Sequence, residues 1–310
     1  MSAPTLHITL AGYGGDGKSV IVVLLPGLGG NGLSFPTTFL SGVMRATGAH
    51  MGVRVTYGLP VLDSAQSTAA EVWQALAAAP LGLPEHPPPA VLVLGYSMGG
   101  FVAQCMTQAV PLRFRLQGLI LVSTAMPTKA KIPVPLQSTL RTLRSAASTE
   151  SKCRHASEVD KLFPKQWLDS ITPRKIHELV HAVAIGRVSR GVRTAQLHLV
   201  STFMLKPPSF LHEDPGVPVL VLHGAKDDIL SYSCMKAAAA RRPWTTFVSF
   251  PDAGHALFIQ CEEDTVAHIR QWFAAAAAAA TAAGAAAAAT PSPYAATVWA
   301  ASPSITWECL

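Results

Sequence analysis

A glycine-flanked serine directly after a short apolar run is the feature that most restricts how this chain can fold. Residues 90–94 are all apolar, and the sequence Gly-Tyr-Ser-Met-Gly-Gly follows at 95–100. An apolar run of this length predicts a buried strand, and the residues after the glycines are typical of a helix start. The serine would then stand at a sharp strand-to-helix turn, where Gly95 and Gly99 leave room for the backbone. The pattern predicts that the hydroxyl of Ser97 projects above a parallel sheet as a nucleophile.

A serine hydroxyl reacts poorly unless a histidine takes its proton and a carboxylate orients that histidine. Downstream of Ser97, a strand pattern at 217–222 leads into a loop with Asp227, and a second at 245–250 leads into a loop with His255. Because the carboxyl ends of parallel strands meet at one edge of a sheet, these loops should lie close together. We therefore predict Ser97 as nucleophile, Asp227 as the acid and His255 as the base.

Other residues compete for two of these roles. Asp228, next to the preferred carboxylate, is the alternative acid, while Asp252 follows a proline and favours a turn. The alternative interpretation of His255 is a solvated loop histidine without a catalytic role. His198 and His223 are expected to be packed or surface residues.

A second donor for a developing oxyanion is expected from the loop after an earlier strand. The strongest β pattern of the chain, at 20–25, is followed by a glycine-rich loop at 26–32. Glycines let the backbone approach a reacting carbonyl closely. The predicted oxyanion donors are the backbone N–H groups of Leu28 and Met98.

With these motifs in place, residues 20–273 resemble an α/β-hydrolase of the small esterase, lactonase and haloperoxidase-like group. The segments that carry the resemblance are LLPGLGGNG, VLGYSMGGFVAQ, GLILVSTAMP, VPVLVLHGAKDDIL and DAGHALF. The chain departs from the family pattern at Pro26-Gly27, where His-Gly is usual, and at 57–64, where an Asp-x-x-Gly-x-Gly segment is usual. The resemblance implies hydrolysis through an acyl-enzyme, with no metal and no organic cofactor.

Two glycine-rich motifs suggest phosphate binding but lack the required context. Residues 12–19 satisfy the pattern of a phosphate loop, yet a strand pattern follows them instead of a helix. Residues 27–32 satisfy a dinucleotide-binding pattern, yet no acidic residue lies between Asp16 and Asp63 to bind a ribose. The first motif instead predicts a hairpin turn, whose two strands would form the antiparallel edge of the sheet.

Alternating strand and helix patterns predict an α/β fold with a mostly parallel sheet and helices on both faces. The strands are expected near 5–11, 20–25, 52–57, 90–94, 118–123, 217–222 and 245–250. The helices are expected near 34–47, 67–79, 98–110, 231–241 and 262–275.

The chain is expected to divide into a hydrolase core at 1–125 and 213–273 and a helical lid at 126–212. Helical patterns in the lid lie at 136–147, 157–171, 173–188 and 192–205. From 274 to 310 the sequence becomes an alanine-rich, low-complexity tail. Its alanine tract can extend the last helix, and the remainder is predicted to be disordered.

Charge is concentrated in the lid, with fourteen Lys and Arg against five Asp and Glu between 126 and 212, in a chain of net charge +6. This excess either attracts an anionic substrate or lipid surface, or forms a solvated basic helix face. No aromatic-rich stripe or recognised module accompanies it, which argues against nucleic-acid binding.

The five cysteines are odd in number and scattered, which indicates reduced thiols, a cytoplasmic setting and no zinc site. Neither a signal peptide nor a transmembrane segment is expected.

The predicted function is a serine hydrolase that cleaves a small-molecule or lipid-like carboxylic ester or lactone. One alternative is a ligand receptor or scaffold that carries the triad with negligible turnover. Another is an acyltransferase or perhydrolase that uses the same triad. An aspartate at the turn would be expected for halide or epoxide substrates, whereas this chain has Ser97 there.

Overall fold

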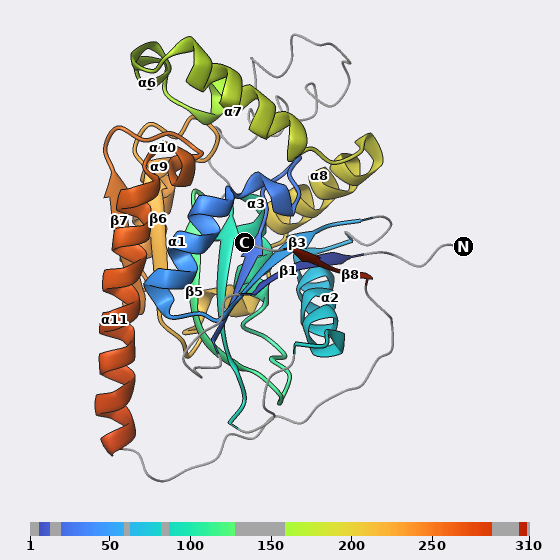
Figure 1. Ribbon diagram of the computed structural model, residues 1–310. Coiled ribbons are helices and arrows are strands. Elements are labelled where there is room, and N and C mark those ends of the chain that lie inside the picture. Colours follow the sequence, from blue (N-terminus) through green and yellow to red (C-terminus); the bar gives the residue numbers. More distant parts are fainter. Residues whose placement is uncertain are drawn as a thin grey trace.

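A single sheet of eight strands runs through the described part of the protein (Figure 1). The computed structural model describes residues 6–12, 20–58, 63–81, 87–127, 159–286 and 304–308. The strands are β1 (His7–Gly12), β2 (Val20–Leu25), β3 (Met51–Thr56), β4 (Ala90–Tyr96), β5 (Arg115–Val122), β6 (Val219–Gly224), β7 (Thr245–Phe250) and β8 (Ser304–Glu308). Their order across the sheet is β7-β6-β5-β4-β2-β3-β1-β8.

Six neighbouring pairs in the sheet are parallel and one is antiparallel. Strands β3, β2, β4, β5, β6 and β7 pair in parallel along their row, and β8 pairs in parallel with β1. Only β1 and β3 are antiparallel. The prediction of a mostly parallel sheet is therefore confirmed.

The predicted N-terminal hairpin is wrong. Strand β1 does not pair with β2, because β3 lies between them and pairs with both. All six residues of β2 are buried, and β2 has parallel neighbours on both sides, as expected for a strand in the middle of an α/β sheet. The predicted turn itself falls on residues 13–19, outside the described residues.

Helices cover both faces of the sheet, as predicted. They are α1 (Thr37–Thr47), α2 (Ala65–Ala78), α3 (Met98–Cys105), α6 (Lys165–Ser170), α7 (Pro173–Ile185), α8 (Arg190–Leu205), α9 (Tyr232–Ala240), α10 (Leu257–Gln260) and α11 (Glu262–Ala286), with short 3₁₀ helices η1 (Gly32–Ser34) and η2 (Ser209–His212). Buried residues of α2, α3, α8 and α9 pack on one face, and those of α1, α6, α7 and α11 belong to the cluster on the other.

The alternation of side chains along β2 explains why one strand serves two cores. Ile21 and Val23 belong to the cluster with α3, whereas Val22 and Leu24 belong to the cluster with α1. Successive side chains of a strand point to opposite faces, so a strand covered on both sides must be apolar at every position. The continuous apolar run of β2 reflects this double burial.

The segment between β5 and β6 is helical where it is described. Helices α6 and α7 lie above the sheet, and α8 connects them to it (Figure 1). Thr172 caps α7 by accepting a hydrogen bond from the Lys175 N–H, with Pro173 in the first turn, and Ser189 caps α8. The predicted helix at 136–147 and the start of the one at 157–171 lie outside the described residues.

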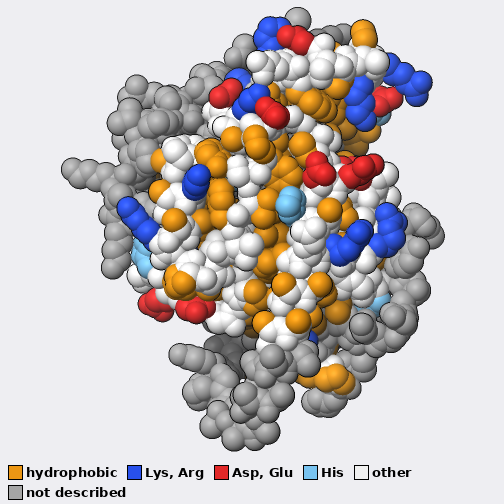
Figure 2. All heavy atoms as spheres, turned by 90° about the vertical axis from the view of Figure 1, so that its left-hand side faces the viewer, with side chains coloured by type: hydrophobic (Ala, Val, Ile, Leu, Met, Phe, Trp, Pro, Cys, Tyr) orange, Lys and Arg blue, Asp and Glu red, His pale blue; other side chains and the backbone are white. Residues whose placement is uncertain are grey.

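The last helix continues into the alanine tract, as the sequence suggested. Helix α11 reaches Ala286, eleven residues beyond the predicted end at 275. The side chains of Ala274 and Ala275 are exposed, and hydrophobic side chains run through the middle of the face that carries α11 (Figure 2). No helix within the described ranges is both long and apolar enough to cross a membrane.

The prediction that the end of the tail is disordered is wrong for its last described residues. Ser304–Glu308 form β8, which pairs with β1 over five residues. The outer edge of β1 would otherwise present unpaired N–H and C=O groups, and an added strand satisfies them.

Candidate active site

The turn that carries Ser97 joins β4 to α3 in a strained backbone conformation. Ser97 has φ 53° and ψ −118°, a combination that residues with a side chain rarely adopt. A Cβ on Gly95 would lie 2.5 Å from the carbonyl oxygen of Gly99, and one on Gly99 would collide with the carbonyl of Leu25. The two glycines are therefore required by close backbone contacts on either side of the serine.

Thr124, two residues after the end of β5, supports this turn, and no sequence pattern singled it out. Its hydroxyl donates a buried hydrogen bond of 2.7 Å to the carbonyl oxygen of Ser97. A Cβ on Gly100 would overlap the Thr124 side chain, so glycine at 100 leaves the space that the threonine occupies. Thr124 thus ties the serine backbone to the end of the neighbouring strand.

Three predicted side chains form one chain of hydrogen bonds above the sheet. The Ser97 Oγ lies 2.9 Å from His255 Nε2, and His255 Nδ1 lies 2.8 Å from Asp227 Oδ2. An ionised carboxylate only accepts hydrogen bonds, so Nδ1 carries the proton and Nε2 is free to accept one from the serine. All three residues are buried, and the imidazole ring packs 5.2 Å from the ring of Tyr96.

Backbone contacts hold the loops of Asp227 and His255 against each other. The Lys226 N–H donates to the carbonyl oxygen of Ala253 over 3.0 Å. A Cβ on Gly224 would collide with the carbonyls of Ala253 and Gly254. Glycine at the end of β6 therefore permits the close approach that brings the carboxylate to the imidazole.

The carboxylate of Asp227 is buried but strongly paired. Its Oδ1 accepts hydrogen bonds from the N–H groups of Ile229 and Leu230, at 2.8 and 2.9 Å. Burial alone would raise the pKa of this carboxyl, but the charge and hydrogen bond of His255, with help from His223 and Leu230, hold the pKa below its ordinary value. Asp227 is therefore ionised and oriented to accept from the imidazole.

His223 is a second buried imidazole beside the same carboxylate. Its Nε2 lies 3.0 Å from the Leu230 carbonyl oxygen and 3.3 Å from Asp227 Oδ2. A carbonyl can only accept, so Nε2 carries the proton in this arrangement. Burial lowers the pKa of His223 despite the attraction of Asp227. His223 packs against the Asp227 loop, whereas His198 is exposed on α8.

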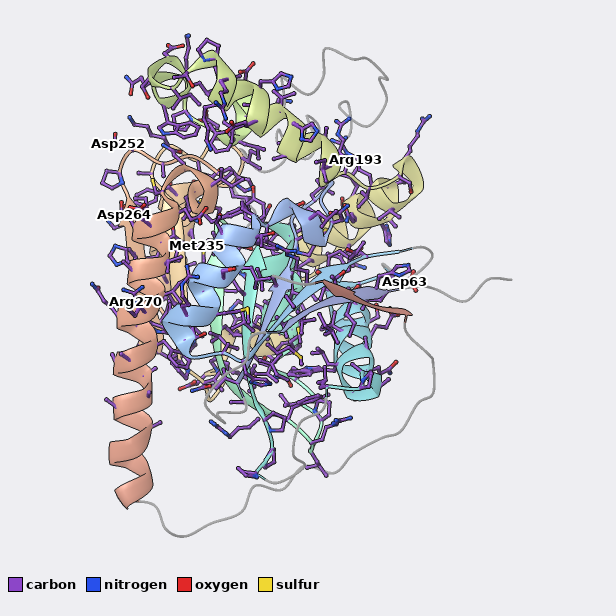
Figure 3. The ribbon with its side chains drawn as sticks, in the orientation of Figure 1. Asp63, Arg193, Met235, Asp252, Asp264 and Arg270 are labelled. Atoms are coloured by element: carbon purple, nitrogen blue, oxygen red, sulfur yellow. The ribbon has the colours of Figure 1, made fainter. Side chains whose placement is uncertain are left out.

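The two competing carboxylates lie outside the hydrogen-bonded chain. Asp228 is exposed, with no hydrogen bond to either histidine among the described residues. Asp252 forms a 2.8 Å ion pair with Lys226, which also donates to Gln166 of α6. Figure 3 shows Asp252 in the loop between β7 and α10, on the side of the molecule nearest α6.

The glycine-rich loop after β2 lies directly against the serine turn. A Cβ on Gly27 would lie 2.9 Å from the Tyr96 ring and 3.2 Å from the Cβ of Ser97. The Met98 N–H stands at the first position of α3, where it has no intrahelical partner. Across the described ranges, neither this N–H nor that of Leu28 donates a hydrogen bond to the protein. Both donors are therefore available to a bound group.

A comparison with family profiles identifies the family of the chain. The profile of the alpha/beta hydrolase family matches residues 22–269, most of the chain. The chain belongs to this family. A sequence comparison with curated proteins gives no match.

Solved structures of esterases and of a bromoperoxidase share the fold. An esterase from Thermogutta terrifontis has 21% sequence identity and a TM-score of 0.62, with 87% of this chain and 93% of that chain covered. A bromoperoxidase from Bacillus anthracis has 14% identity and a TM-score of 0.63, with 86% and 94% covered. An esterase from a Rhodococcus species has 19% identity and a TM-score of 0.60, with 87% and 94% covered. At these identities the similarity establishes the fold of this hydrolase.

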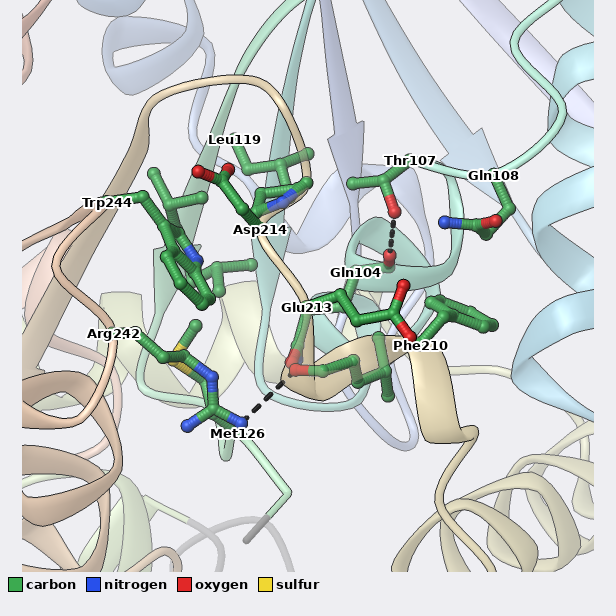
Figure 4. Close-up of a pocket in the computed structure, with 14 residues that line it drawn as sticks. Gln104, Thr107, Gln108, Leu119, Met126, Phe210, Glu213, Asp214, Arg242 and Trp244 are labelled. Atoms are coloured by element: carbon green, nitrogen blue, oxygen red, sulfur yellow. Dashed lines mark hydrogen bonds between the residues drawn. The ribbon is translucent and has the colours of Figure 1, made fainter. Parts of the chain in front are cut away.

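A cavity of the hydrolase lies away from the serine turn, between α3, η2 and the start of β7 (Figure 4). Arg242 borders it and is buried, with its guanidinium donating to the carbonyl oxygens of Pro127, Leu211 and Ala238. None of the three hydrogen-bonded residues Ser97, Asp227 and His255 lines this cavity.

Cysteine side chains and potential metal ligands are scattered over the described ranges. There, no group of three or more His, Cys, Asp or Glu side chains is arranged to hold a metal ion. The described cysteines, Cys105, Cys234 and Cys261, are unpaired. Burial raises the pKa of the Cys105 thiol to about 12, which disfavours the reactive thiolate.

Proposed function

We propose that this protein is a serine hydrolase that cleaves a carboxylic ester or lactone through an acyl-enzyme. The observation that carries the proposal is the unbroken chain of hydrogen bonds from Ser97 through His255 to Asp227, with the serine held at a strained turn. Membership of the alpha/beta hydrolase family supports the same chemistry. In this proposal Ser97 is the nucleophile, His255 the base and Asp227 the acid.

In the acylation step, Ser97 Oγ attacks the carbonyl carbon of the ester while His255 Nε2 takes the hydroxyl proton. The carbonyl oxygen becomes an oxyanion, which the N–H groups of Leu28 and Met98 stabilise. Collapse of this intermediate breaks the bond to the alkoxy group, and the imidazolium returns the proton to the leaving oxygen. Asp227 stabilises the imidazolium without itself becoming protonated.

In the deacylation step, water takes the place of the alcohol. His255 removes a proton from the water as it attacks the acyl carbon, and the intermediate then expels Ser97, which recovers its proton. The products are a carboxylic acid and an alcohol, or a single hydroxy acid from a lactone. No metal or organic cofactor takes part in this sequence.

We propose further that residues 126–212 act as a lid over the core formed by 1–125 and 213–273. In support, the Ala256 N–H donates to the carbonyl oxygen of Leu162, and a Cβ on Gly254 would lie 2.8 Å from that same oxygen. The loop of the proposed base is thus in contact with the inserted segment. We expect the lid to shape a pocket for a small-molecule or lipid-like ester, and we expect a cytoplasmic protein.

The test is turnover of a p-nitrophenyl ester series of increasing acyl length, together with lactones, by the wild type and by Ser97→Ala. Loss of the nucleophile should lower kcat by roughly 10⁴-fold or more. A short-chain optimum would favour a small esterase, and a long-chain optimum with interfacial activation a lipase. If Ser97→Ala retains most of the activity, the assignment of the nucleophile is wrong.

A further inference from the structure

A loop rich in glycine needs support from outside to keep one backbone conformation. Four of the six residues at 27–32 are glycines, and Gly29 has φ +80°. Within this stretch, the Gly30 N–H donates to the Gly27 carbonyl oxygen over 3.1 Å. An oxyanion donor is effective only when its N–H is fixed in advance where charge develops. The residues that fix this loop therefore bear directly on the proposed reaction.

Gln196 of α8 supplies two of these contacts. Its Oε1 accepts a hydrogen bond of 2.6 Å from the Gly29 N–H, and its Nε2 donates one of 3.3 Å to the Gly30 carbonyl oxygen. The side chain is fully buried at 0% exposure. A primary amide both donates and accepts, so one glutamine satisfies two polar groups of adjacent glycines.

The connection between α7 and α8 adds contacts to the same loop, at Gly29 and Asn31. The Val188 N–H donates to the Gly29 carbonyl oxygen over 3.2 Å, and the Asn31 N–H donates to that of Gly186 over 2.8 Å. The Asn31 side chain donates to the Arg187 carbonyl oxygen over 3.3 Å. Figure 3 shows Arg193, one turn before Gln196, at the beginning of α8.

The other end of the loop is fixed by the serine turn. Gly27 lies against the Tyr96 ring and the Cβ of Ser97, as described above. Leu28 therefore stands between a residue packed on the nucleophile and a residue bonded to Gln196. Its N–H remains without an acceptor among the described residues.

We propose that Gln196 is a positioning residue for hydrolysis, which holds the loop so that the Leu28 N–H points to the acyl oxygen in the transition state. This inference rests on the proposed function, because it assigns a role in the same reaction. It makes the inserted helical segment part of the catalytic framework, in addition to any role as a cover.

The test is Gln196→Met, which keeps the length of the side chain and removes both hydrogen bonds. Loss of one oxyanion donor costs about 10²- to 10³-fold in kcat, and a displaced donor should cost less, roughly 10- to 100-fold. We expect KM for a p-nitrophenyl ester to change less than about threefold, because the donor acts mainly in the transition state.

The Ki of a trifluoromethyl ketone inhibitor is a second measurement, and a general loss of protein stability would not change it. The Ser97 oxygen adds to the carbonyl carbon of the ketone, His255 takes the proton, and the carbonyl oxygen becomes an oxyanion in the same position. Its Ki should rise for Gln196→Met by the same factor by which kcat/KM falls.

The matched control is Arg242→Met. Arg242 is also buried, and its guanidinium donates to the carbonyl oxygens of Pro127, Leu211 and Ala238, away from the serine turn. We expect both variants to lower Tm, but Arg242→Met should keep kcat and the Ki of the ketone within about twofold of the wild type.

If the wild type turns over esters and Gln196→Met matches Arg242→Met in kcat and Ki, the positioning role is overturned while the proposed function stands. If the wild type hydrolyses no ester or lactone, both the positioning role and the proposed function are wrong. Should Gln196→Met fail to fold, Gln196→Asn keeps an amide in the buried site but is one methylene group too short to make both hydrogen bonds. A kcat lowered several-fold at constant KM would then support the role, and an unchanged kcat would overturn it.

Discussion

Gln196 and Arg242 both hold the inserted helical segment to the sheet, but they contact different regions of the molecule. Gln196 bonds to two glycines of the loop beside the serine turn. Arg242 bonds to Pro127, where the chain enters the insertion, and to Leu211, where the chain leaves it. Both side chains are buried, and both act on backbone groups.

The comparison indicates that the Arg242 contacts serve mainly the stability of the fold, whereas the Gln196 contacts serve the proposed reaction. At Arg242 the bonded groups lie away from the hydrogen-bonded chain of Ser97, so the contact can serve stability alone. At Gln196 the bonded groups neighbour the Leu28 N–H, which has no acceptor among the described residues and lies beside the proposed nucleophile Ser97. We expect changes near the serine turn to affect turnover, and changes at Arg242 to affect unfolding.

The largest expected effect comes from replacing Ser97, which should change kcat and the free energy of unfolding independently. Ser97→Gly should lower kcat by roughly 10⁴-fold or more, since it removes the nucleophile. It should also raise the free energy of unfolding by about 1–2 kcal/mol, because glycine adopts the strained conformation at φ 53° without a side-chain clash. Ester kinetics and chemical denaturation measure the two effects. A clear loss of stability would contradict the strain argument.

The next largest effect concerns the attachment at Arg242. Arg242→Met leaves three carbonyl groups without their donor, so we expect the free energy of unfolding to fall by about 2–4 kcal/mol. The kcat should stay within about twofold of the wild type at a temperature where the variant is folded. Arg241→Met, at an exposed neighbour, is the control and should change stability by less than about 0.5 kcal/mol. A large fall in kcat for Arg242→Met would remove the distinction between the two attachments.

A smaller effect is expected from Asp227 on acidification. Its pKa is lower in the folded protein than its ordinary value of 3.8, so its ionised form stabilises the fold. That contribution is present above the ordinary pKa and is lost as the pH falls through the lower, folded pKa. Asp227→Asn should therefore be less stable than the wild type at about pH 6, and the difference should shrink below about pH 3. Thermal unfolding across this range measures it, and a gap that widens in acid would contradict the assignment.

The smallest effect calibrates the comparison at a carboxyl group that takes part in neither attachment. Burial and the charge of Asp63 raise the pKa of Glu71, on α2, from 4.5 to about 7. A raised carboxyl pKa means that stability is lost as the pH rises between these two values. Glu71→Gln should therefore raise Tm slightly at about pH 8 and leave it unchanged at about pH 4. The exposed Glu263→Gln serves as control, and an equal shift of Tm at both pH values would argue against the raised pKa.

Most of the fold could be predicted because the sheet is buried on both faces. Strands such as β2 and β4 are continuous apolar runs with glycine-rich loops after them, and such runs have few other interpretations. The pairing of β1 could not be predicted, because the sequence pattern marks a strand without naming its neighbour. The strand β8 was missed because an edge strand paired on one side needs no long apolar run.

The candidate site divides in the same way. Ser97, Asp227 and His255 carry recognisable spacing around strand ends, so the sequence singled them out. Thr124 acts through one hydrogen bond and Gln196 through two, all to backbone groups that are distant in sequence. Gln196 lies 167 positions from Gly29, and nothing in the pattern of its helix distinguishes it from a packed residue. Contacts of this kind depend on which distant segments the fold brings together, so they could not be predicted from the sequence alone.

The most direct test of the central claim, that His255 activates the hydroxyl of Ser97, is covalent labelling with a fluorophosphonate followed by peptide mass mapping. The account predicts one adduct per chain, on the peptide that contains Ser97, no adduct with Ser97→Ala, and a rate of labelling lowered by orders of magnitude with His255→Ala. An adduct at another residue, or labelling of Ser97→Ala at the rate of the wild type, would contradict it.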